Sequence, residues 1–218
     1  MTQCCAPSRS VQGTDKFFSR QARRYKKQFV KRGLAKEQRL LAEGIGLSPL
    51  AGKSILEIGC GVGGLHLTLL QRGAQSALGI DVSEGMLREA RGVATDLHLE
   101  EKAAYRLGDF VGMSDSVGEA DIAVLDKVVC CYENLDELLA RSLSRARSTY
   151  AVSFPRPNAF IHLLFSIPIF IGRILRWSFH PYWHDWIAMT SRIEREGFRQ
   201  IFRKQTFFWD VCVFERVA

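Results

Sequence analysis

The sequence has no Cys-x-x-Cys pair, no apolar core typical of a signal peptide, no internal repeat and no low-complexity tract. Its apolar stretches are interrupted by polar residues before they reach the length that spans a bilayer. These absences argue against a disulfide framework, a secreted chain and a repeat protein, and they predict a reducing, cytoplasmic setting. The six cysteines are then expected to be free thiols: Cys4, Cys5, Cys60, Cys130, Cys131 and Cys212.

The composition is that of an ordinary globular protein, with 47% hydrophobic and 24% charged residues among 218. We expect a flexible tail over residues 1–13 and one domain over residues 14–218. The net charge of +7 is uneven, because residues 1–40 carry eleven Lys and Arg against two carboxylates while the remainder carries nineteen against twenty-one. The basic segment could face an anionic acceptor, an acidic lipid surface or a nucleic acid, or it could be a solvated helix face.

Strands and helices alternate along the chain, and such alternation is typical of a doubly wound parallel sheet. Helices are expected over about 15–43, interrupted near Gly33, and over 64–71, 83–97, 135–146 and 187–195. After Pro155 the alternation is broken by an aromatic-rich segment, residues 156–186. The expected strands cover 54–58, 77–80, 103–106, 121–125 and 149–154, and two more lie within 198–217.

The stretch from Ser54 to Gly64 joins a short apolar strand to a glycine-rich turn, a combination that indicates binding of a nucleotide-like ligand. A phosphate-binding P-loop does not fit, because the Gly46 to Ser54 motif has the wrong spacing and precedes its strand. The Gly59-x-Gly61-x-x-Gly64 spacing does fit a dinucleotide site, with Asp81 in the acidic position. These residues alone are compatible with a dinucleotide and equally with another adenosine-containing ligand.

Carboxylates recur at the ends of successive expected strands. Glu57 precedes the glycine turn, and Asp81, Asp109 and Asp126 follow or close the next three strands. In an open parallel sheet these positions line one crevice, where Asp81 could meet ribose hydroxyls and Asp109 an adenine amino group. Each carboxylate alone could serve only a turn or a helix cap, so the interpretation rests on their joint placement.

The motifs Leu56 to Gly63, Gly79 to Ser83 and Gly108 to Phe110, with Gly197-Phe198 before the last strands, resemble the class I S-adenosylmethionine-dependent methyltransferases. No tyrosine is followed by lysine four positions on, as a short-chain dehydrogenase would require. The resemblance implies a Rossmann-like, mostly parallel seven-stranded sheet with an antiparallel C-terminal strand, and S-adenosylmethionine as cofactor. The binding residues it implies are Glu57, Gly59, Cys60, Gly61, Gly63, Asp81, Val82, Met86, Asp109, Phe110 and Asp126.

A narrower similarity concerns the magnesium-protoporphyrin O-methyltransferases. It rests on Tyr25 in the basic leader, on the segment from Leu125 to Tyr132, and on His184 thirteen residues before Gly197. That family places a histidine where this chain has Cys131. The residues expected near the reaction point are Asp126, Lys127, Cys130, Cys131 and Tyr132 after the fourth strand, and Tyr25 in the segment 14–50, which could fold over the cofactor as a basic helical lid. With His184 from the similarity, the catalytic candidates are Tyr25, Cys131, Tyr132 and His184.

Residues 156–186 are expected to form an aromatic cap that selects a small lipophilic or aromatic acceptor, or a helix that contacts an anionic membrane surface through Arg173 and Arg176. Ordinary core packing would also account for the segment. A metal site at His180 and His184 is not expected, because Pro181 interrupts a helix between them. Nucleic acid is a weaker alternative as acceptor, because only the basic leader favours it. A catalytically inactive cofactor-binding protein is a further alternative.

Overall fold

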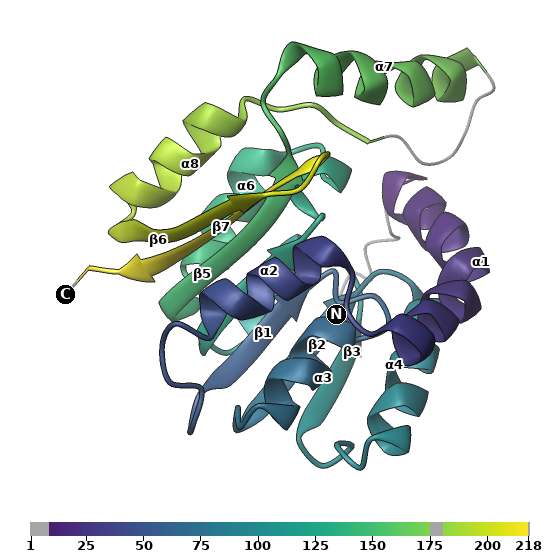
Figure 1. Cartoon of the computed structure of the whole chain (residues 1–218). Helices are drawn as coiled ribbons and strands as arrows, with labels where there is room; N and C mark the ends of the chain where they lie inside the picture. Colours follow the sequence, from purple (N-terminus) through teal and green to yellow (C-terminus); the bar gives the residue numbers. More distant parts are fainter. Residues whose placement is uncertain (1–8, 175–180, 218) are drawn as a thin grey trace, which may run out of the picture.

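The computed structural model describes the backbone of residues 9–174 and 181–217, with side chains except those of residues 9–12 and 168–174. Seven strands form one sheet in the order β3-β2-β1-β4-β5-β7-β6 (Figure 1). All neighbouring pairs from β3 to β5 are parallel, and β7 is antiparallel to both β5 and β6. The predicted fold class is therefore confirmed. The strands are β1 (Ser54–Ile58), β2 (Ser76–Asp81), β3 (Ala103–Leu107), β4 (Ala120–Asp126), β5 (Ala146–Pro155), β6 (Phe198–Gln205) and β7 (Trp209–Arg216).

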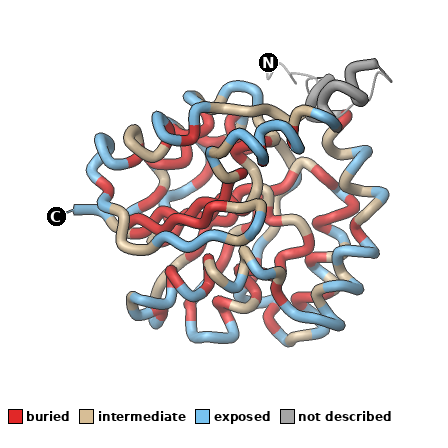
Figure 2. The backbone as a smooth tube through the Cα atoms, turned by 45° about the horizontal axis from the view of Figure 1, so that its top comes forward, coloured by how far each residue is buried: buried red, intermediate tan, exposed pale blue. Residues whose placement is uncertain are grey.

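Helices cover both faces of the sheet. Leucine, isoleucine and alanine side chains of α2 (Lys36–Ile45), α3 (Gly64–Gln71) and α4 (Glu84–Asp96) share one buried cluster with one face. The short α5 (Phe110–Met113), α6 (Leu135–Leu143) and α8 (Trp186–Arg195) share another cluster with the opposite face. Buried residues concentrate in the strands and on the inner sides of these helices (Figure 2). The sheet is thus a rigid base for the loops at its carboxyl ends.

Two helices lie outside these layers. Helix α1 (Arg9–Arg32) packs against α4 beside β3, and α7 (Ala159–Ile174) lies beyond the end of β5 (Figure 1). Within the described parts of the chain, no helix combines the length and apolar character needed to cross a membrane. Two single turns of 3-10 helix, Ser114–Ser116 and Val129–Cys131, complete the elements.

The start of α1 corrects the predicted tail. The helix begins at Arg9, so residues 9–13 are helical, and residues 1–8 lie outside the described part of the chain. Gly13, a residue that usually weakens helices, is buried here within α1. The predicted break at Gly33 is confirmed, since its N–H closes α1 on the carbonyl of Phe29 at 2.7 Å and its φ is +69°. The helix thus starts earlier than the local sequence predicts, and the burial of Gly13 indicates that packing supports this first part of it.

Candidate functional site

The glycine turn between β1 and α3 is fixed to the neighbouring strand. The N–H groups of Gly59 and Cys60 both donate to the carbonyl of Ile80, at 2.7 and 3.1 Å. Gly59 has a φ of +67°, and a β-carbon there would collide with the side chain of Val128. Gly61 has a φ of +54°, but a β-carbon there would meet no heavy atom within 4 Å. The turn therefore leaves open space beside Gly61, which a ligand can approach closely.

Asp81 closes β2 beside this turn and lies largely buried. Its Oδ2 accepts the N–H of Gly61 at 2.7 Å, and its Oδ1 accepts the N–H of Ser83 at 2.8 Å. Burial raises the pKa of Asp81 to about 6, although both backbone N–H groups act in the opposite direction. The carboxylate is held between the glycine turn and the start of α4, and its role in binding a ribose stays a prediction.

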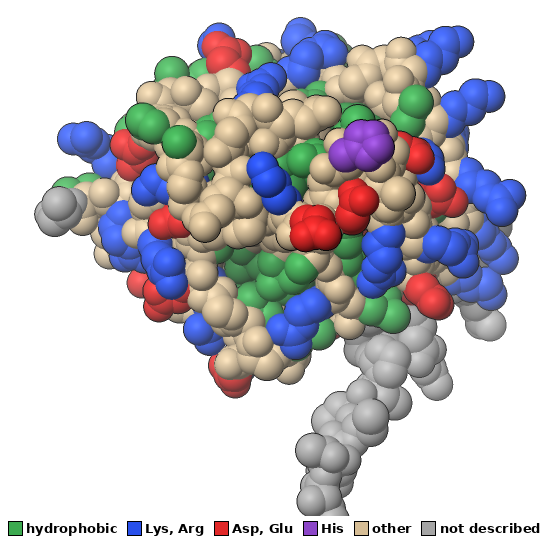
Figure 3. All heavy atoms as spheres, turned by 90° about the horizontal axis from the view of Figure 1, so that it is seen from below, with side chains coloured by type: hydrophobic (Ala, Val, Ile, Leu, Met, Phe, Trp, Pro, Cys, Tyr) green, Lys and Arg blue, Asp and Glu red, His purple; other side chains and the backbone are tan. Residues whose placement is uncertain are grey.

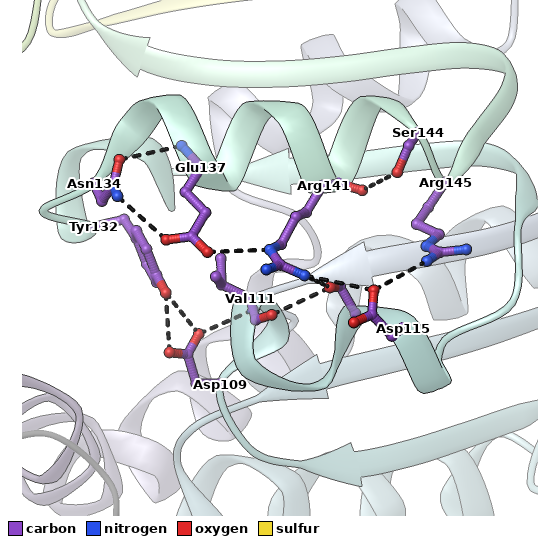
Figure 4. Close-up of polar contacts among 10 residues, drawn as sticks. Asp109, Val111, Asp115, Tyr132, Asn134, Glu137, Arg141, Ser144 and Arg145 are labelled. Carbon is purple, nitrogen blue, oxygen red and sulfur yellow. Dashed lines mark hydrogen bonds and ion pairs between the residues drawn. The ribbon is translucent and has the colours of Figure 1, made fainter. Parts of the chain in front are cut away.

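Asp109 follows β3, and its carboxylate faces the side chain of Tyr132 (Figure 4). The Tyr132 hydroxyl donates to both Asp109 oxygens, at 3.0 and 2.9 Å, and the N–H of Val111 donates to Oδ1 at 3.2 Å. Burial and the negative charge of Asp109 both raise the pKa of Tyr132, so its hydroxyl remains protonated. Tyr132, predicted as catalytic, is therefore bound to a carboxylate that we assigned to cofactor binding.

Glu57 is buried beneath the glycine turn, where His66 holds it. Nδ1 of His66 lies 2.6 Å from Oε2 of Glu57, and the backbone N–H of His66 donates to the same oxygen at 3.2 Å. Nε2 of His66 lies 3.1 Å from the hydroxyl of Tyr105, which links the pair to β3. The sequence interpretation missed His66. The available signal was a histidine among the leucines of helix α3, nine residues after Glu57.

A second polar cluster lies at the end of β4. Asp126 accepts from Ser153 Oγ at 2.6 Å and from Gln38 Nε2 at 2.9 Å. The Lys127 ammonium lies 2.8 Å from Glu37 Oε1 and 3.5 Å from Asp126 Oδ2. Burial alone would lower the pKa of Lys127, but these two carboxylates outweigh burial and raise it. The first turn of α2 thereby contacts the end of β4, a relationship that the sequence did not reveal.

Helix α1 covers the glycine turn from the side of α4. A β-carbon at Gly64 would lie 2.9 Å from the ring of Phe29, and Ala22 of α1 forms a small buried cluster with Val62 and Met86. Ser19 Oγ accepts the N–H of Gly85 at 3.1 Å and lies 2.8 Å from Ser83 Oγ. This position suits the predicted lid, whose movement stays a prediction.

These groups surround one cavity of about 1010 Å³ at the carboxyl ends of the strands. Three of the four catalytic candidates, Tyr25, Cys131 and Tyr132, line it. Gly63 does not line it. The lining also includes Glu37 and Gln38 of α2, Lys127 after β4 and Trp209 of β7. Of these four residues the sequence indicates only Lys127, as a residue near the reaction point. The predicted cofactor residues that line it are Glu57, Gly59, Cys60, Gly61, Asp81, Val82, Met86, Asp109, Phe110 and Asp126.

His184 lies beside this cavity rather than in its wall. Its Nε2 is 2.9 Å from the carbonyl oxygen of Tyr132, and its ring lines a shallower neighbouring hollow. A carbonyl only accepts hydrogen bonds, so Nε2 carries a proton here. His180, the other histidine considered for a metal, lies outside the described residues, and the described ranges hold no group of three or more His, Cys, Asp or Glu placed to bind a metal.

The paired cysteines after β4 differ in exposure. Cys130 is buried and Cys131 is partly exposed, and both thiols lie near the carbonyl of Lys127, at 3.4 and 3.3 Å. The neighbouring Cys131 thiol and burial raise the pKa of Cys130 well above its usual value. Cys130 therefore remains a protonated thiol at neutral pH, which disfavours thiolate chemistry there.

Comparison with known proteins agrees with this geometry. Residues 55–148 match the model of the methyltransferase domain family. Among curated relatives, an uncharacterized protein of Haemophilus influenzae is 43% identical over 67 residues, covering 30% of this chain and 22% of the relative. Ajmaline N-methyltransferase of Rauvolfia serpentina is 28% identical over 85 residues, covering 39% of this chain and 28% of the relative. The chain thus spans about a quarter of the length of these curated relatives.

The likeness to one solved structure extends over nearly the whole chain. The magnesium protoporphyrin IX methyltransferase of Synechocystis, solved with bound S-adenosylhomocysteine, superposes with a TM-score of 0.74 at 20% identity, covering 96% of this chain and all of that one. At this identity the likeness shows the fold. With the domain match it confirms the predicted Rossmann-like methyltransferase fold.

Proposed function

We propose that this chain is a class I S-adenosylmethionine-dependent methyltransferase that transfers the cofactor's methyl group to a small acceptor with an aromatic or lipophilic body. The observation that carries the proposal is the single cavity of about 1010 Å³. It joins the glycine turn, Asp81 and Asp109 to an aromatic wall formed by Tyr25, Phe165 and Trp209. Ligand sites commonly measure about 300–1,000 Å³, so this cavity has room for a cofactor and a small acceptor together.

The described residues fit S-adenosylmethionine. The open space beside Gly61 suits the methionine part, and the buried Asp81 carboxylate suits the ribose hydroxyls. Asp109 would accept from the adenine amino group, while Met86 and Phe110, each 3% exposed, would border the adenine ring. The cofactor supplies an electrophilic methyl group, so the protein has mainly to orient the acceptor and exclude water.

The catalytic candidates divide by their contacts. Tyr25 and Cys131 line the cavity and are the proposed acceptor-side residues. Tyr132 is bound to Asp109, which favours a role in positioning the cofactor. His184 contacts the backbone of Tyr132, so we propose that it positions the loop after β4.

The test combines binding and turnover. Isothermal titration calorimetry with S-adenosylmethionine should detect one site, and Asp81→Asn should weaken it. Labelled S-adenosylmethionine incubated with a small-molecule extract should then give a labelled aromatic or lipophilic product. Asp136→Asn, on the exposed side of α6 and outside the cavity lining, is the matched control and should bind like the wild type. Absence of cofactor binding by the wild type would overturn the proposal, and binding without any turnover would favour a catalytically inactive protein.

Nucleic acid is the alternative acceptor, and the same labelling assay distinguishes it from a small molecule. The face seen in Figure 3 carries Lys and Arg side chains around its edge, most densely on its right-hand side, with carboxylates among them. Basic side chains supply the sequence-independent part of nucleic-acid binding, so by themselves they do not indicate an RNA acceptor. Labelled RNA in place of a labelled small molecule would contradict the proposed acceptor class.

A peripheral membrane contact by a cytoplasmic protein is proposed for α7. Four of its apolar residues are exposed at the spacing of one helix face, namely Phe160, Leu163, Leu164 and Ile167. The opposite face buries Ile161 and Phe165 against the domain. Arg176 and the side chain of Arg173 lie outside the described residues. Leu163→Glu should reduce the fraction of protein that cosediments with anionic vesicles, whereas Glu119→Gln, which is remote from α7, should not. Equal binding of the two variants to the vesicles would count against this contact.

A further inference from the structure

We propose that the acceptor side of the cavity takes a weakly basic aromatic amine and disfavours a carboxylate, and that Glu37, Lys127 and Asp126 set this preference. The inference rests on the proposed methyltransferase function and names its acceptor class. It starts from the charges around the cavity. Among the described lining residues, seven carboxylates face two cationic groups: Glu37, Glu57, Asp81, Asp109, Asp126, Glu133 and Glu137 against Arg24 and Lys127.

Lys127 offers little attraction to an anion. Arg24 is exposed on α1, so Lys127 is the interior cation among the described lining residues. Its ammonium already lies 2.8 Å from Glu37 and 3.5 Å from Asp126, so the three groups together carry one negative charge. A carboxylate on the acceptor would meet net repulsion there, while a neutral or positive nitrogen would not.

The cluster is rigid enough to discriminate between acceptors. Asp126 is fixed by hydrogen bonds from Ser153 and Gln38. Lys127 has a φ of +60°, an uncommon conformation for a residue with a side chain, and its backbone N–H donates to Ser153 Oγ at 2.9 Å. Backbone conformations of this kind persist where the surroundings hold them, and they concentrate at functional sites.

Aromatic side chains lie beside the charged cluster. The Lys127 ammonium is 5.9 Å from the ring centre of Trp209, and Trp209, Tyr25 and Phe165 all line the cavity. These rings provide flat apolar surface for an aromatic body, with the carboxylates of Glu37 and Asp126 nearby for its polar group. The combination suits an aromatic amine better than an aliphatic acid.

The chemistry favours nitrogen at this position. The nitrogen lone pair forms the new bond to the methyl carbon, the carbon–sulfur bond breaks with its electron pair on sulfur, and the nitrogen then loses a proton to water. Positive charge thus passes from sulfur to nitrogen, where Glu37 and Asp126 would stabilise it. A strongly basic amine would be protonated at neutral pH and lack the lone pair, so the expected acceptor is a weakly basic one.

Two ligands that share a ring test the inference. 5-Aminoindole and indole-5-carboxylate are titrated into the full chain saturated with S-adenosylhomocysteine, and the amine is then offered with labelled S-adenosylmethionine. We expect the wild type to bind the amine at least about tenfold more tightly and to methylate its nitrogen. Glu37→Gln removes one charge beside Lys127, so it should tighten carboxylate binding about tenfold and shrink this preference.

Glu43→Gln is the matched control, because Glu43 lies on the same helix and pairs with Lys204 at the surface, 2.6 Å away. It should leave both affinities unchanged, and a thermal melt checks that each variant folds. Wild-type binding of the carboxylate as tightly as the amine, binding of neither ligand, or an unchanged preference in Glu37→Gln would overturn the inference. Retained S-adenosylhomocysteine binding in those cases leaves the methyltransferase proposal standing, whereas its loss overturns both.

Discussion

The Tyr132 hydroxyl donates to both oxygens of the Asp109 carboxylate, at 3.0 and 2.9 Å, and so joins the loop after β4 to the loop after β3. A carboxylate held at two points cannot rotate freely, yet each oxygen retains a further lone pair for a ligand. The side chain that the sequence suggested as catalytic thus fixes the carboxylate that we propose to bind the cofactor.

Tyr132→Phe should therefore weaken S-adenosylmethionine binding about fivefold, the effect of about 1 kcal/mol for a lost hydrogen bond. The KM for the cofactor should rise while kcat changes little, because the reacting atoms keep their surroundings. Calorimetry and steady-state kinetics measure the two quantities. Tyr182→Phe is the control, since its hydroxyl is 3.5 Å from Glu133 and forms at most a weak contact. A large fall in kcat with unchanged KM would show instead that Tyr132 acts on the acceptor.

The raised pKa of Asp81 predicts a pH dependence of cofactor binding. Above about pH 6 the carboxylate is ionised and accepts hydrogen bonds fully, and below that value it becomes protonated. The affinity for S-adenosylmethionine should fall about tenfold between pH 7 and pH 5, as for one group that binds a proton in the free protein. Asp81→Asn should bind weakly at both pH values, without this dependence. Equal wild-type affinity at pH 7 and pH 5 would contradict the assignment.

Residues next to the strand ends could be predicted from the sequence. Asp81 and Asp109 each follow a recognisable strand, and the topology of a parallel sheet alone brings their positions into one crevice. Glu37 and Trp209 could not be predicted, because α2 and β7 reach the cavity only through packing across the sheet. No local pattern marks a residue whose partner lies 90 positions away, as Glu37 lies from Lys127.

The bounds of the helices and strands divide in the same way, into those set by local signals and those set by long-range pairing. The bounds of α3 follow from local signals, and its predicted range of 64–71 is confirmed. Helix α6 ends at Leu143, three residues before the predicted end, and β5 begins at Ala146, three residues before its predicted start. The strand starts earlier because Ala146 pairs with Ala120 of β4, so that backbone pairing extends β5 toward α6. Long-range pairing, rather than propensity, decides such boundaries.

Gly85 and Gly92 on α4 test the contact between α1 and the cofactor site. A β-carbon at Gly85 would lie 2.7 Å from Oγ and 2.8 Å from Cα of Ser19, so Gly85→Ala should displace α1. We expect a loss of stability of about 1–3 kcal/mol, the usual cost of overpacking, and faster dissociation of S-adenosylmethionine. Thermal melts and stopped-flow fluorescence measure these effects.

Gly92→Ala is the control on the same helix. Its β-carbon would meet only the end of the flexible Lys26 side chain, at 3.1 Å. Replacing an interior helical glycine should raise stability by about 0.5–1 kcal/mol and leave cofactor dissociation unchanged. If Gly85→Ala and Gly92→Ala released the cofactor at the same rate, the contact of α1 with α4 would have no part in retaining it.

Two glycines of the turn should separate stability from binding. Gly59→Ala places a methyl group against Val128 and forces alanine into a left-handed backbone conformation. Overpacking and backbone strain together should lower the free energy of unfolding by about 2–4 kcal/mol. Gly61→Ala meets no neighbour within 4 Å and carries only the backbone strain, about 1 kcal/mol. Its methyl group instead occupies the open space proposed for the methionine part of the cofactor.

Gly61→Ala should therefore melt within a few degrees of the wild type yet bind S-adenosylmethionine at least about tenfold more weakly, a loss of about 1.4 kcal/mol. Thermal melts and calorimetry on the same preparations give both quantities. Gly52→Ala is the matched control for backbone strain, because Gly52 has a φ of +74°, no neighbour within 4 Å of an added β-carbon, and no place in the cavity lining. It should lose similar stability and keep full cofactor affinity. Equal affinity of Gly61→Ala and Gly52→Ala would show that the space beside Gly61 is not where the cofactor lies.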